Sequence, residues 1–259
     1  MNRDLWRQFA VIFTTLLTLV MNGLATGLPL NNITTGEISD RWVNYFTPAG
    51  YVFAIWGVIY LGLAAFTLYH SLPSQRENPR LRSIGWLFVA SNLFNSAWIV
   101  AWQYLYVNIS WVIMLGILAT LLTLYARIGT GIKPTNRREM WLINVPFSIY
   151  TAWITVATIA NTTVFLQNLG WEGAPLSGPF WSAFVIVVGA AITGIVVYTR
   201  RDVAFAGVVI WAYVGIIVKY TGTALVMGTA GAMVAVVAGV LIAGLIRTRP
   251  PGRLQGSLA

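Results

Sequence analysis

The chain has 259 residues, of which 58% are hydrophobic and 9% are charged, and its mean hydropathy is +0.73. Soluble domains carry about 25% charged residues, so this composition excludes a soluble globular domain and predicts a polytopic membrane protein. The formal charge of +9 comes from short basic clusters between long apolar runs, which excludes the continuous basic face of a nucleic-acid-binding protein.

Eight apolar runs are long enough to cross a bilayer, which requires about 20 residues per helix. In chain order they are residues 8–28, 48–70, 84–106, 110–128, 141–161, 180–199, 203–221 and 224–246. The sequence therefore predicts an all-α integral membrane protein with about eight transmembrane helices. The segments 29–47, 107–110, 162–179 and 221–223 are expected to be loops on one side of the membrane.

The basic residues alternate between successive connections. Fourteen of the 16 Lys and Arg residues fall in the termini or in every second connection, and only Arg41 and Lys219 lie on the opposite side. Since cytoplasmic segments carry an excess of Lys and Arg, we expect a multi-pass protein of the plasma (inner) membrane with both termini in the cytoplasm. An even number of spans agrees with this orientation.

The first five runs and the last three differ in composition. The first five are rich in aromatic and amide residues, whereas the last three consist largely of Val, Ala, Gly and Ile. In the last run small residues recur every fourth position, at Gly231, Ala235, Gly239 and Ala243. This stripe is typical of closely packed helices. We predict a five-helix membrane bundle at 1–165, a three-helix membrane extension at 166–247 that adds a layer or a docking surface, and a flexible cytoplasmic tail at 248–259.

Amides and tryptophans share single faces of three predicted helices. In "SNLFNSAWIVAWQY" (91–104), helical spacing places Asn95, Trp98 and Trp102 on one side. An asparagine in hydrocarbon needs a hydrogen-bond partner and so points inward, while an indole can form the wall of an apolar cavity and donate one hydrogen bond. These faces supply the candidate ligand-binding residues Trp56, Tyr60, Asn95, Trp98, Trp102, Tyr150, Trp153 and Asn161. We expect them to line a pocket for a flat or elongated apolar ligand with few polar groups.

Plain packing is the alternative for each of these residues. Asn95 would then bridge two helices, and the tryptophans would fill the core or form interfacial belts.

Other chemistry has little support in the sequence. With no cysteine and one histidine, thiolate, disulfide and His-based metal sites are excluded or nearly so, and no metal site is expected. No Asp or Glu lies in the middle of a run, as the carboxylate relay of a coupled carrier would require.

Three short segments occur in a recognisable order on the second, third and fifth runs. They are "TPAGYVFAIWGVIY" with Pro48, Trp56, Gly57 and Tyr60, "LFNSAW" with Asn95 and Trp98, and "VPFSIYTAWITVATIAN" with Pro146, Phe147, Trp153 and Asn161. Together they resemble the TspO/MBR family of tryptophan-rich sensory proteins, which are related to the mitochondrial translocator protein. The resemblance covers roughly residues 8–165, and longer bacterial members of the family resemble this chain in having further helices.

The resemblance implies a five-helix bundle with a pocket for a porphyrin, a sterol or a synthetic isoquinoline-type ligand. It assigns ligand contacts to Trp56 and Asn95, and it associates a tryptophan of the fifth span with porphyrin breakdown. That family tryptophan lies four residues after the proline, where this chain has Tyr150. The family's spacing of eight from Trp to Asn is kept instead by Trp153 and Asn161, so the role stays open between Tyr150 and Trp153.

We therefore predict a membrane protein that binds a hydrophobic small molecule, a tetrapyrrole (porphyrin) or a lipid-like compound, for sensing, transport or regulation. Its expected partners are membrane lipids, this ligand, and a homo-oligomer or a larger membrane complex, without nucleic acid. No catalytic residues are expected, because no acid/base or nucleophile constellation is visible. The main alternative is a structural accessory subunit of a larger membrane complex, for example a pigment–protein complex. A transporter with a midplane site ranks third, because no internal repeat is visible.

Overall fold

The computed structural model describes residues 3–28, 30–42, 44–171 and 173–247, and every regular element in these ranges is helical. The long helices are α1 (Arg3–Gly27), α3 (Ile55–Ser71), α4 (Pro79–Gln103), α5 (Val107–Ile128), α7 (Val145–Asn168), α8 (Gly178–Arg200), α9 (Val203–Lys219) and α10 (Ala224–Ile246). The short elements are η1 (Leu30–Asn32), α2 (Thr35–Asp40), η2 (Gly50–Ala54), η3 (Pro73–Gln75), α6 (Arg137–Glu139) and η4 (Met140–Asn144). The predicted all-α membrane fold is confirmed, and the predicted tail at 248–259 lies outside the described residues.

All eight predicted runs form helices. In the described part of the chain seven helical stretches are long and apolar enough to cross a membrane: Arg3–Gly27, Gly50–Ser71, Pro79–Gln103, Val107–Ile128, Arg137–Asn168, Gly178–Arg200 and Ala224–Ile246. The eighth run corresponds to α9, which is apolar but has 17 residues. At a rise of 1.5 Å per residue α9 extends about 25 Å, slightly less than the hydrocarbon core of a typical bilayer.

Several helix boundaries differ from those predicted by hydropathy. Helix α4 begins at Pro79, before the predicted start at 84, because the Asn78 side chain caps it by accepting a hydrogen bond of 2.9 Å from the backbone N–H of Arg80. The turn predicted at 107–110 lies just before Val107, where Leu105 has a φ of 61°. A capping side chain at Asn78 and a left-handed backbone at Leu105 mark these ends, and a hydropathy profile detects neither.

A π-helical turn leads into the helix that carries the third tryptophan face. The elements α6, η4 and α7 form one continuous helical stretch, and Pro146 lies in the first turn of α7. Since proline has no N–H to donate, the wider turn Met140–Asn144 accommodates it without ending the helix. Gly62 of α3 allows a close approach here, because a Cβ at Gly62 would lie 3.0 Å from the Cβ of Pro146.

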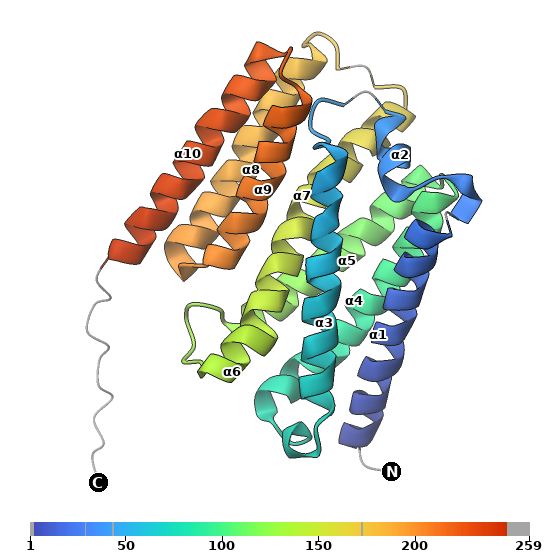
Figure 1. The fold of residues 1–259 in the computed structure, drawn as a ribbon, viewed down its shortest axis with the longest axis vertical. Coiled ribbons are helices and arrows are strands. Elements are labelled where there is room, and N and C mark those ends of the chain that lie inside the picture. The colour runs from blue at the N-terminus through green and yellow to red at the C-terminus, as the bar shows by residue number, and fades with distance from the viewer. Residues whose placement is uncertain (1–2, 29, 43, 172, 248–259) are drawn as a thin grey trace.

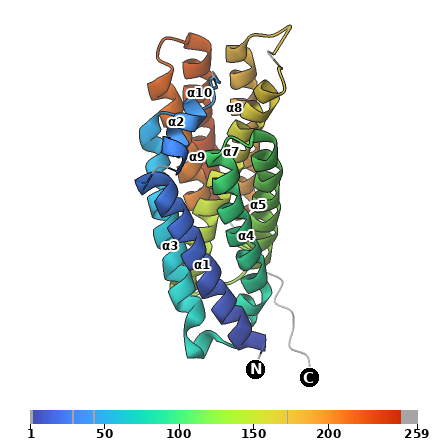
Figure 2. The same cartoon turned by 90° about the vertical axis from the view of Figure 1, so that its right-hand side faces the viewer.

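The helices form two neighbouring groups. Figures 1 and 2 show α8, α9 and α10 together on one side of a bundle made by α1, α3, α4, α5 and α7. Helix α7 lies between the groups and packs on both α5 and α9. Helix α2 lies at the end of the bundle opposite to the start of α1, and α10 runs toward the end at which α1 starts (Figure 1).

The small-residue stripe of α10 faces away from the rest of the chain. Ala235, Gly239 and Ala243 are exposed, and a Cβ built at Gly239 would meet nothing within 4 Å. Helix α10 packs on α8 and α9 through another face, which carries its buried residues Val226, Ala230, Val237 and Gly244. The expectation that the stripe packs closely on another helix was therefore wrong within this chain. Helix α10 contacts both of its neighbours, α8 and α9, through the face that carries its buried residues.

Candidate functional site

A large groove lies between α1, α3 and α4, beneath α2. It encloses about 690 Å³, and we call it the tryptophan groove. Its lining comprises Leu19, Asn22, Gly23, Thr26, Thr34, Thr35, Gly36, Glu37, Asp40, Gly50, Phe53, Ala54, Trp56, Gly57, Tyr60, Trp98 and Ile99. Ligand pockets commonly measure about 300–1,000 Å³, so the groove is large enough for a macrocycle or a lipid-like molecule.

A second, smaller cavity continues from the groove toward α7. This inner cavity measures about 50 Å³. It is lined by Thr35, Ser39, Thr47, Pro48, Phe53, Trp56, Trp98, Trp102, Met114, Trp153, Val156, Ala157, Ala160, Asn161 and Val164. Thr35, Phe53, Trp56 and Trp98 line both spaces. The inner cavity is too small for a macrocycle and has room only for a substituent of a ligand in the groove.

The structure brings most of the predicted site residues to these two spaces. Trp56 and Trp98 line both. The other lining candidates are Tyr60 in the tryptophan groove, and Trp102, Trp153 and Asn161 in the inner cavity. Asn95 and Tyr150 line neither space. Of the two residues between which the family's tryptophan role was open, Trp153 is therefore the one beside a cavity.

Ring contacts hold the tryptophans in fixed positions. The Trp56 ring stacks on Tyr60 with centroids 5.4 Å apart and meets Trp153 edge-on at 6.2 Å. On the facing helix Trp98 and Trp102 stack at 5.7 Å with 18° between their planes. Offset-stacked and edge-to-face pairs are the favoured geometries of aromatic rings. The walls of both spaces are therefore largely formed before any ligand binds, which lowers the entropic cost of binding.

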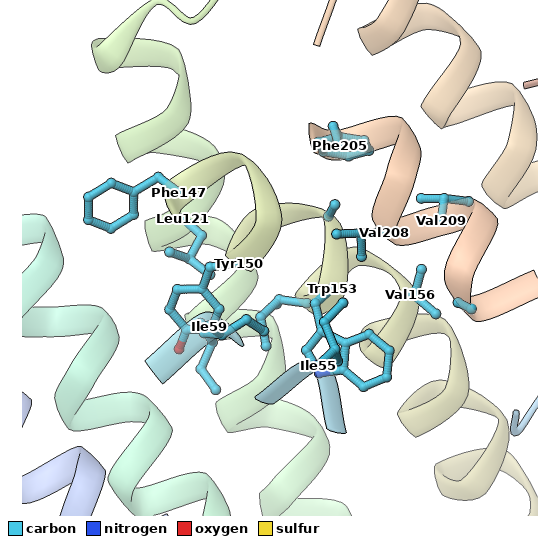
Figure 3. Close-up of a cluster of buried hydrophobic side chains, with 14 of the residues drawn as sticks. Ile55, Ile59, Leu121, Phe147, Tyr150, Trp153, Val156, Phe205, Val208 and Val209 are labelled. Atoms are coloured by element: carbon cyan, nitrogen blue, oxygen red, sulfur yellow. The ribbon is translucent and has the colours of Figure 1, made fainter. Parts of the chain in front are cut away.

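Asn95 joins three helices rather than facing a cavity. Its Oδ1 accepts a hydrogen bond of 2.8 Å from Asn22 Nδ2 on α1, and its own Nδ2 donates to the Tyr150 hydroxyl on α7 at 3.0 Å. Asn95 and Tyr150 are both fully buried, and Figure 3 shows Tyr150 within a cluster of buried hydrophobic side chains. This placement agrees with the packing alternative for Asn95, in which its amide bridges helices. The amide bridges three helices, α1, α4 and α7, and not two.

Asn22 is a groove residue that the sequence reasoning missed. The polar residues Thr14, Thr18 and Asn22 recur every fourth position within an otherwise apolar run, which places them on one helix face. All three are buried. Because polar residues inside a membrane helix face the bundle interior, this spacing alone could have identified α1 as a wall of the site.

Three polar atoms around the inner cavity have no hydrogen-bond partner among the described residues. They are the indole Nε1 of Trp98, the indole Nε1 of Trp153 and the amide Oδ1 of Asn161, on side chains at most 6% exposed. Trp102 differs, since its Nε1 donates to the backbone oxygen of Thr35 at 3.3 Å. Unpaired buried donors and acceptors are costly, so two N–H donors and one acceptor are available for the polar group of a ligand.

The short helix α2 covers the tryptophan groove. It begins with a capping box in which the Thr34 hydroxyl accepts from the Glu37 backbone N–H and the Glu37 carboxylate accepts from the Thr34 backbone N–H. These hydrogen bonds from Thr34 lower the pKa of the Glu37 carboxyl below its ordinary value, so the group stays charged near neutral pH. At the other end Asp40 pairs with Lys219 at 2.6 Å. Residues 29–47 were predicted as loop, although the Thr-x-x-Glu spacing signals this helix.

The described residues contain no group of three or more His, Cys, Asp or Glu side chains that could hold a metal ion. The arrangement suits a ligand held by aromatic contacts and a few neutral hydrogen bonds.

The family comparison covers most of the chain. A family model for TSPO-like proteins matches residues 8–244, a stretch that includes the three C-terminal helices. The searches of curated proteins and of solved structures each found no match.

Proposed function

The chain belongs to the TSPO-like family, and on that premise we propose that it binds a hydrophobic small molecule, a tetrapyrrole or a lipid-like compound, in the tryptophan groove. Binding serves sensing, transport or regulation, and catalysis is not part of the role. The protein lies in the plasma (inner) membrane with both termini in the cytoplasm, since 14 of the 16 basic residues fall on that side.

One observation carries this proposal. A groove of about 690 Å³ walled by Trp56 and Trp98 adjoins a cavity of about 50 Å³ at which Trp98 and Trp153 each hold an unpaired N–H. Apolar walls with a few convergent polar groups are typical of small-molecule sites.

The two spaces suggest how such a ligand binds. Its flat or elongated body lies in the groove against the stacked rings of Trp56 and Tyr60. A carbonyl or carboxyl substituent enters the inner cavity and accepts from the Trp98 and Trp153 indoles. The acidic residues at the groove do not oppose this, because Glu37 is engaged in its capping box and Asp40 in its ion pair with Lys219.

Protoporphyrin binding followed by absorption spectroscopy tests the proposal. A saturable shift of the porphyrin Soret band is expected at about micromolar concentration, equivalent to roughly 8 kcal/mol. Trp56→Ala removes one wall of both spaces, so we expect at least about tenfold weaker binding, worth about 1.4 kcal/mol. Trp153→Phe keeps a ring but removes an N–H, for which about threefold to tenfold weaker binding is expected.

Trp86→Phe is the matched control, because Trp86 is 55% exposed and lines neither space. Its titration should coincide with that of the unmodified protein. A titration that does not saturate, or one that Trp56→Ala leaves unchanged, overturns the assignment of the groove.

An accessory subunit of a larger membrane complex is the second candidate function. Helix α10 favours it, since few of its side chains are buried and its small-residue stripe faces outward. Extraction in a gentle detergent tests it: a defined heteromeric assembly supports this candidate, and a lone protein contradicts it.

A further inference from the structure

A third space lies between α7 and α8, apart from the tryptophan groove. This α7–α8 pocket encloses about 320 Å³. It is lined by Asn44, Tyr45, Phe46, Thr158, Ile159, Thr162, Thr163, Leu166, Gln167, Trp171, Gly173, Gly178, Trp181, Ser182, Phe184 and Val185. It shares no lining residue with the groove or the inner cavity, and it lies where the C-terminal helices meet the five-helix bundle.

Asn44 presents an unused hydrogen-bond donor to this pocket. Its Oδ1 accepts from the backbone N–H groups of Phe46 and Thr47 and from the Thr47 hydroxyl, at 2.8–3.2 Å. These three bonds fix which end of the amide points into the loop. The opposite end, Nδ2, is buried and has no partner among the described residues, and the residue as a whole is 5% exposed. The two N–H groups of this amide are therefore held in place at the pocket without an acceptor from the described part of the chain.

Ser182 adds a second unused polar group from the other wall. It lies in the first turns of α8, it is 4% exposed, and its hydroxyl has no partner among the described residues. Thr163 on the facing helix already donates its hydroxyl proton to the Ile159 carbonyl at 3.1 Å. The pocket thus offers the Asn44 amide as donor and the Ser182 hydroxyl as donor or acceptor.

The rest of the described lining carries no formal charge, and aromatic side chains form much of it. Trp181 packs edge-on against Phe184 at 5.9 Å and against Trp171 at 5.1 Å. None of the described lining residues is an Asp, Glu, Lys or Arg. Along α7 the lining extends from Thr158 to Gln167, a length of about 13 Å at 1.5 Å per residue. An ionised head group would meet no counter-charge among these described residues, so they favour a neutral ligand.

We propose that the α7–α8 pocket is a second binding site, for a neutral lipid-soluble molecule with a single hydroxyl or carbonyl group. The oxygen of this group accepts from Asn44 Nδ2, and a hydroxyl also exchanges a hydrogen bond with Ser182. The apolar part extends along α7 toward Thr158 between the aromatic side chains of α8. A fatty alcohol or a long-chain ketone has this chemistry.

Photolabelling in phosphatidylcholine nanodiscs tests this site. The probe is a long-chain alcohol that carries a diazirine in its chain, and labelled peptides are identified by mass spectrometry. We expect saturable labelling of peptides that contain residues 158–167 and 178–185, displaced by the unlabelled alcohol. The matched diazirine fatty acid should label these peptides much less, because the pocket offers no cation to its carboxylate.

Two variants give the proposal a sharp test. Ser182→Ala removes a hydroxyl that has no partner in the described part of the chain, so the fold should be unaffected while the half-saturating concentration of the alcohol rises about threefold to tenfold. Val185→Trp fills the pocket and should abolish the saturable labelling. Trp153→Phe, at the inner cavity, should leave labelling unchanged, which separates this site from the tryptophan groove. Labelling that does not saturate, or that neither pocket variant alters, overturns the proposal.

Discussion

The five-helix bundle and the C-terminal helices hold their helices together by different interactions. In the bundle, side chains on different helices bond to each other: Thr18 Oγ1 lies 3.2 Å from Ser96 Oγ, and Asn92 Nδ2 donates to Thr15 Oγ1 at 3.1 Å. In α8 a hydroxyl such as that of Thr193 instead bonds the Gly189 carbonyl of its own helix. Between the C-terminal helices, the Tyr213 hydroxyl of α9 donates to the backbone oxygen of Ile186 on α8 at 2.7 Å. The two regions therefore differ in that pairs of side chains join helices in the bundle, whereas the C-terminal helices bond through a side chain and the backbone.

This difference explains where the cavities lie. Hydrogen bonds with defined partners can hold helices at a fixed separation, and the tryptophan groove lies between α1 and α4, which such pairs join. The C-terminal helices approach closely through small residues, as where Gly189 of α8 lies against the hydroxyl of Tyr213 on α9. A Cβ at Gly189 would lie 2.5 Å from the Tyr213 hydroxyl oxygen, so no space remains there.

The largest expected effect comes from cutting a buried polar link between the two regions. Asp202, which caps α9, accepts hydrogen bonds at Oδ2 from the hydroxyls of Tyr125 at 2.7 Å and Ser148 at 2.5 Å. Its Oδ1 accepts from the backbone N–H of Phe205 at 3.0 Å. Asp202→Ala leaves two buried hydroxyls and the start of α9 without their acceptor, so we expect the free energy of unfolding to fall by about 3 kcal/mol.

Unfolding in mixed micelles by SDS titration measures this loss. Asp202→Asn keeps one oxygen acceptor and should lose about half as much. If Asp202→Ala lowers the free energy of unfolding by less than about 1 kcal/mol, the buried carboxyl does not hold the five-helix bundle and the C-terminal helices together.

A smaller loss is expected from filling the close contact between α9 and η2. Gly215 of α9 is buried, and a Cβ built on it would lie 2.2 Å from Val52 Cγ2 and 3.0 Å from the Cβ of Pro48. Gly215→Ala should therefore force the helices apart and cost about 2 kcal/mol. Gly207→Ala is the matched control on the same helix, because its Cβ meets nothing within 4 Å, and it should be neutral or slightly stabilising. Equal effects of the two substitutions on thermal unfolding would contradict this contact.

Hydropathy predicted the helices well but could not place the contacts between them. The eight runs were visible because burial in lipid demands about 20 apolar residues in succession. The link at Asp202 was not, since it joins α5, α7 and α9 across 54 and 77 residues of sequence. The outward stripe of α10 was misread for the same reason: a run that is apolar all round does not indicate which face meets a neighbour.

The sequence predicted which residues turn toward the candidate site better than it predicted how those residues are arranged there. Trp98, Trp102 and Trp153 turn inward as expected, but of their indole N–H groups only that of Trp102 has a partner among the described residues. Whether an inward residue faces a cavity or another side chain depends on tertiary packing. Asn95 and Trp98 share a helix face, yet Asn95 meets Asn22 and Tyr150 while Trp98 meets open space.

The third prediction concerns this arrangement and uses a double-mutant cycle. Asn95→Leu and Tyr150→Phe each break the 3.0 Å hydrogen bond between α4 and α7, so the double variant should cost less than the sum of the single variants. A coupling of about 1 kcal/mol in SDS unfolding is expected, the order found for side-chain hydrogen bonds between membrane helices. Tyr150→Phe should leave porphyrin affinity unchanged, since Tyr150 lines neither space. A coupling near zero would contradict the bond, and a loss of affinity would place Tyr150 at the ligand.

The smallest expected effect tests the packing of α10. A Cβ at Gly239 would meet nothing within 4 Å, whereas one at Gly244 would lie 3.3 Å from the Val197 carbonyl oxygen of α8. In an isolated chain Gly239→Ala should raise the free energy of unfolding by about 0.5 kcal/mol through the helix preference of alanine, and Gly244→Ala should lower or not change it. If Gly239→Ala instead destabilises the protein, and only at high protein-to-detergent ratio, a second helix packs on the stripe. Close packing through small residues would then connect this chain to a partner in the same way that it connects α10 to α8.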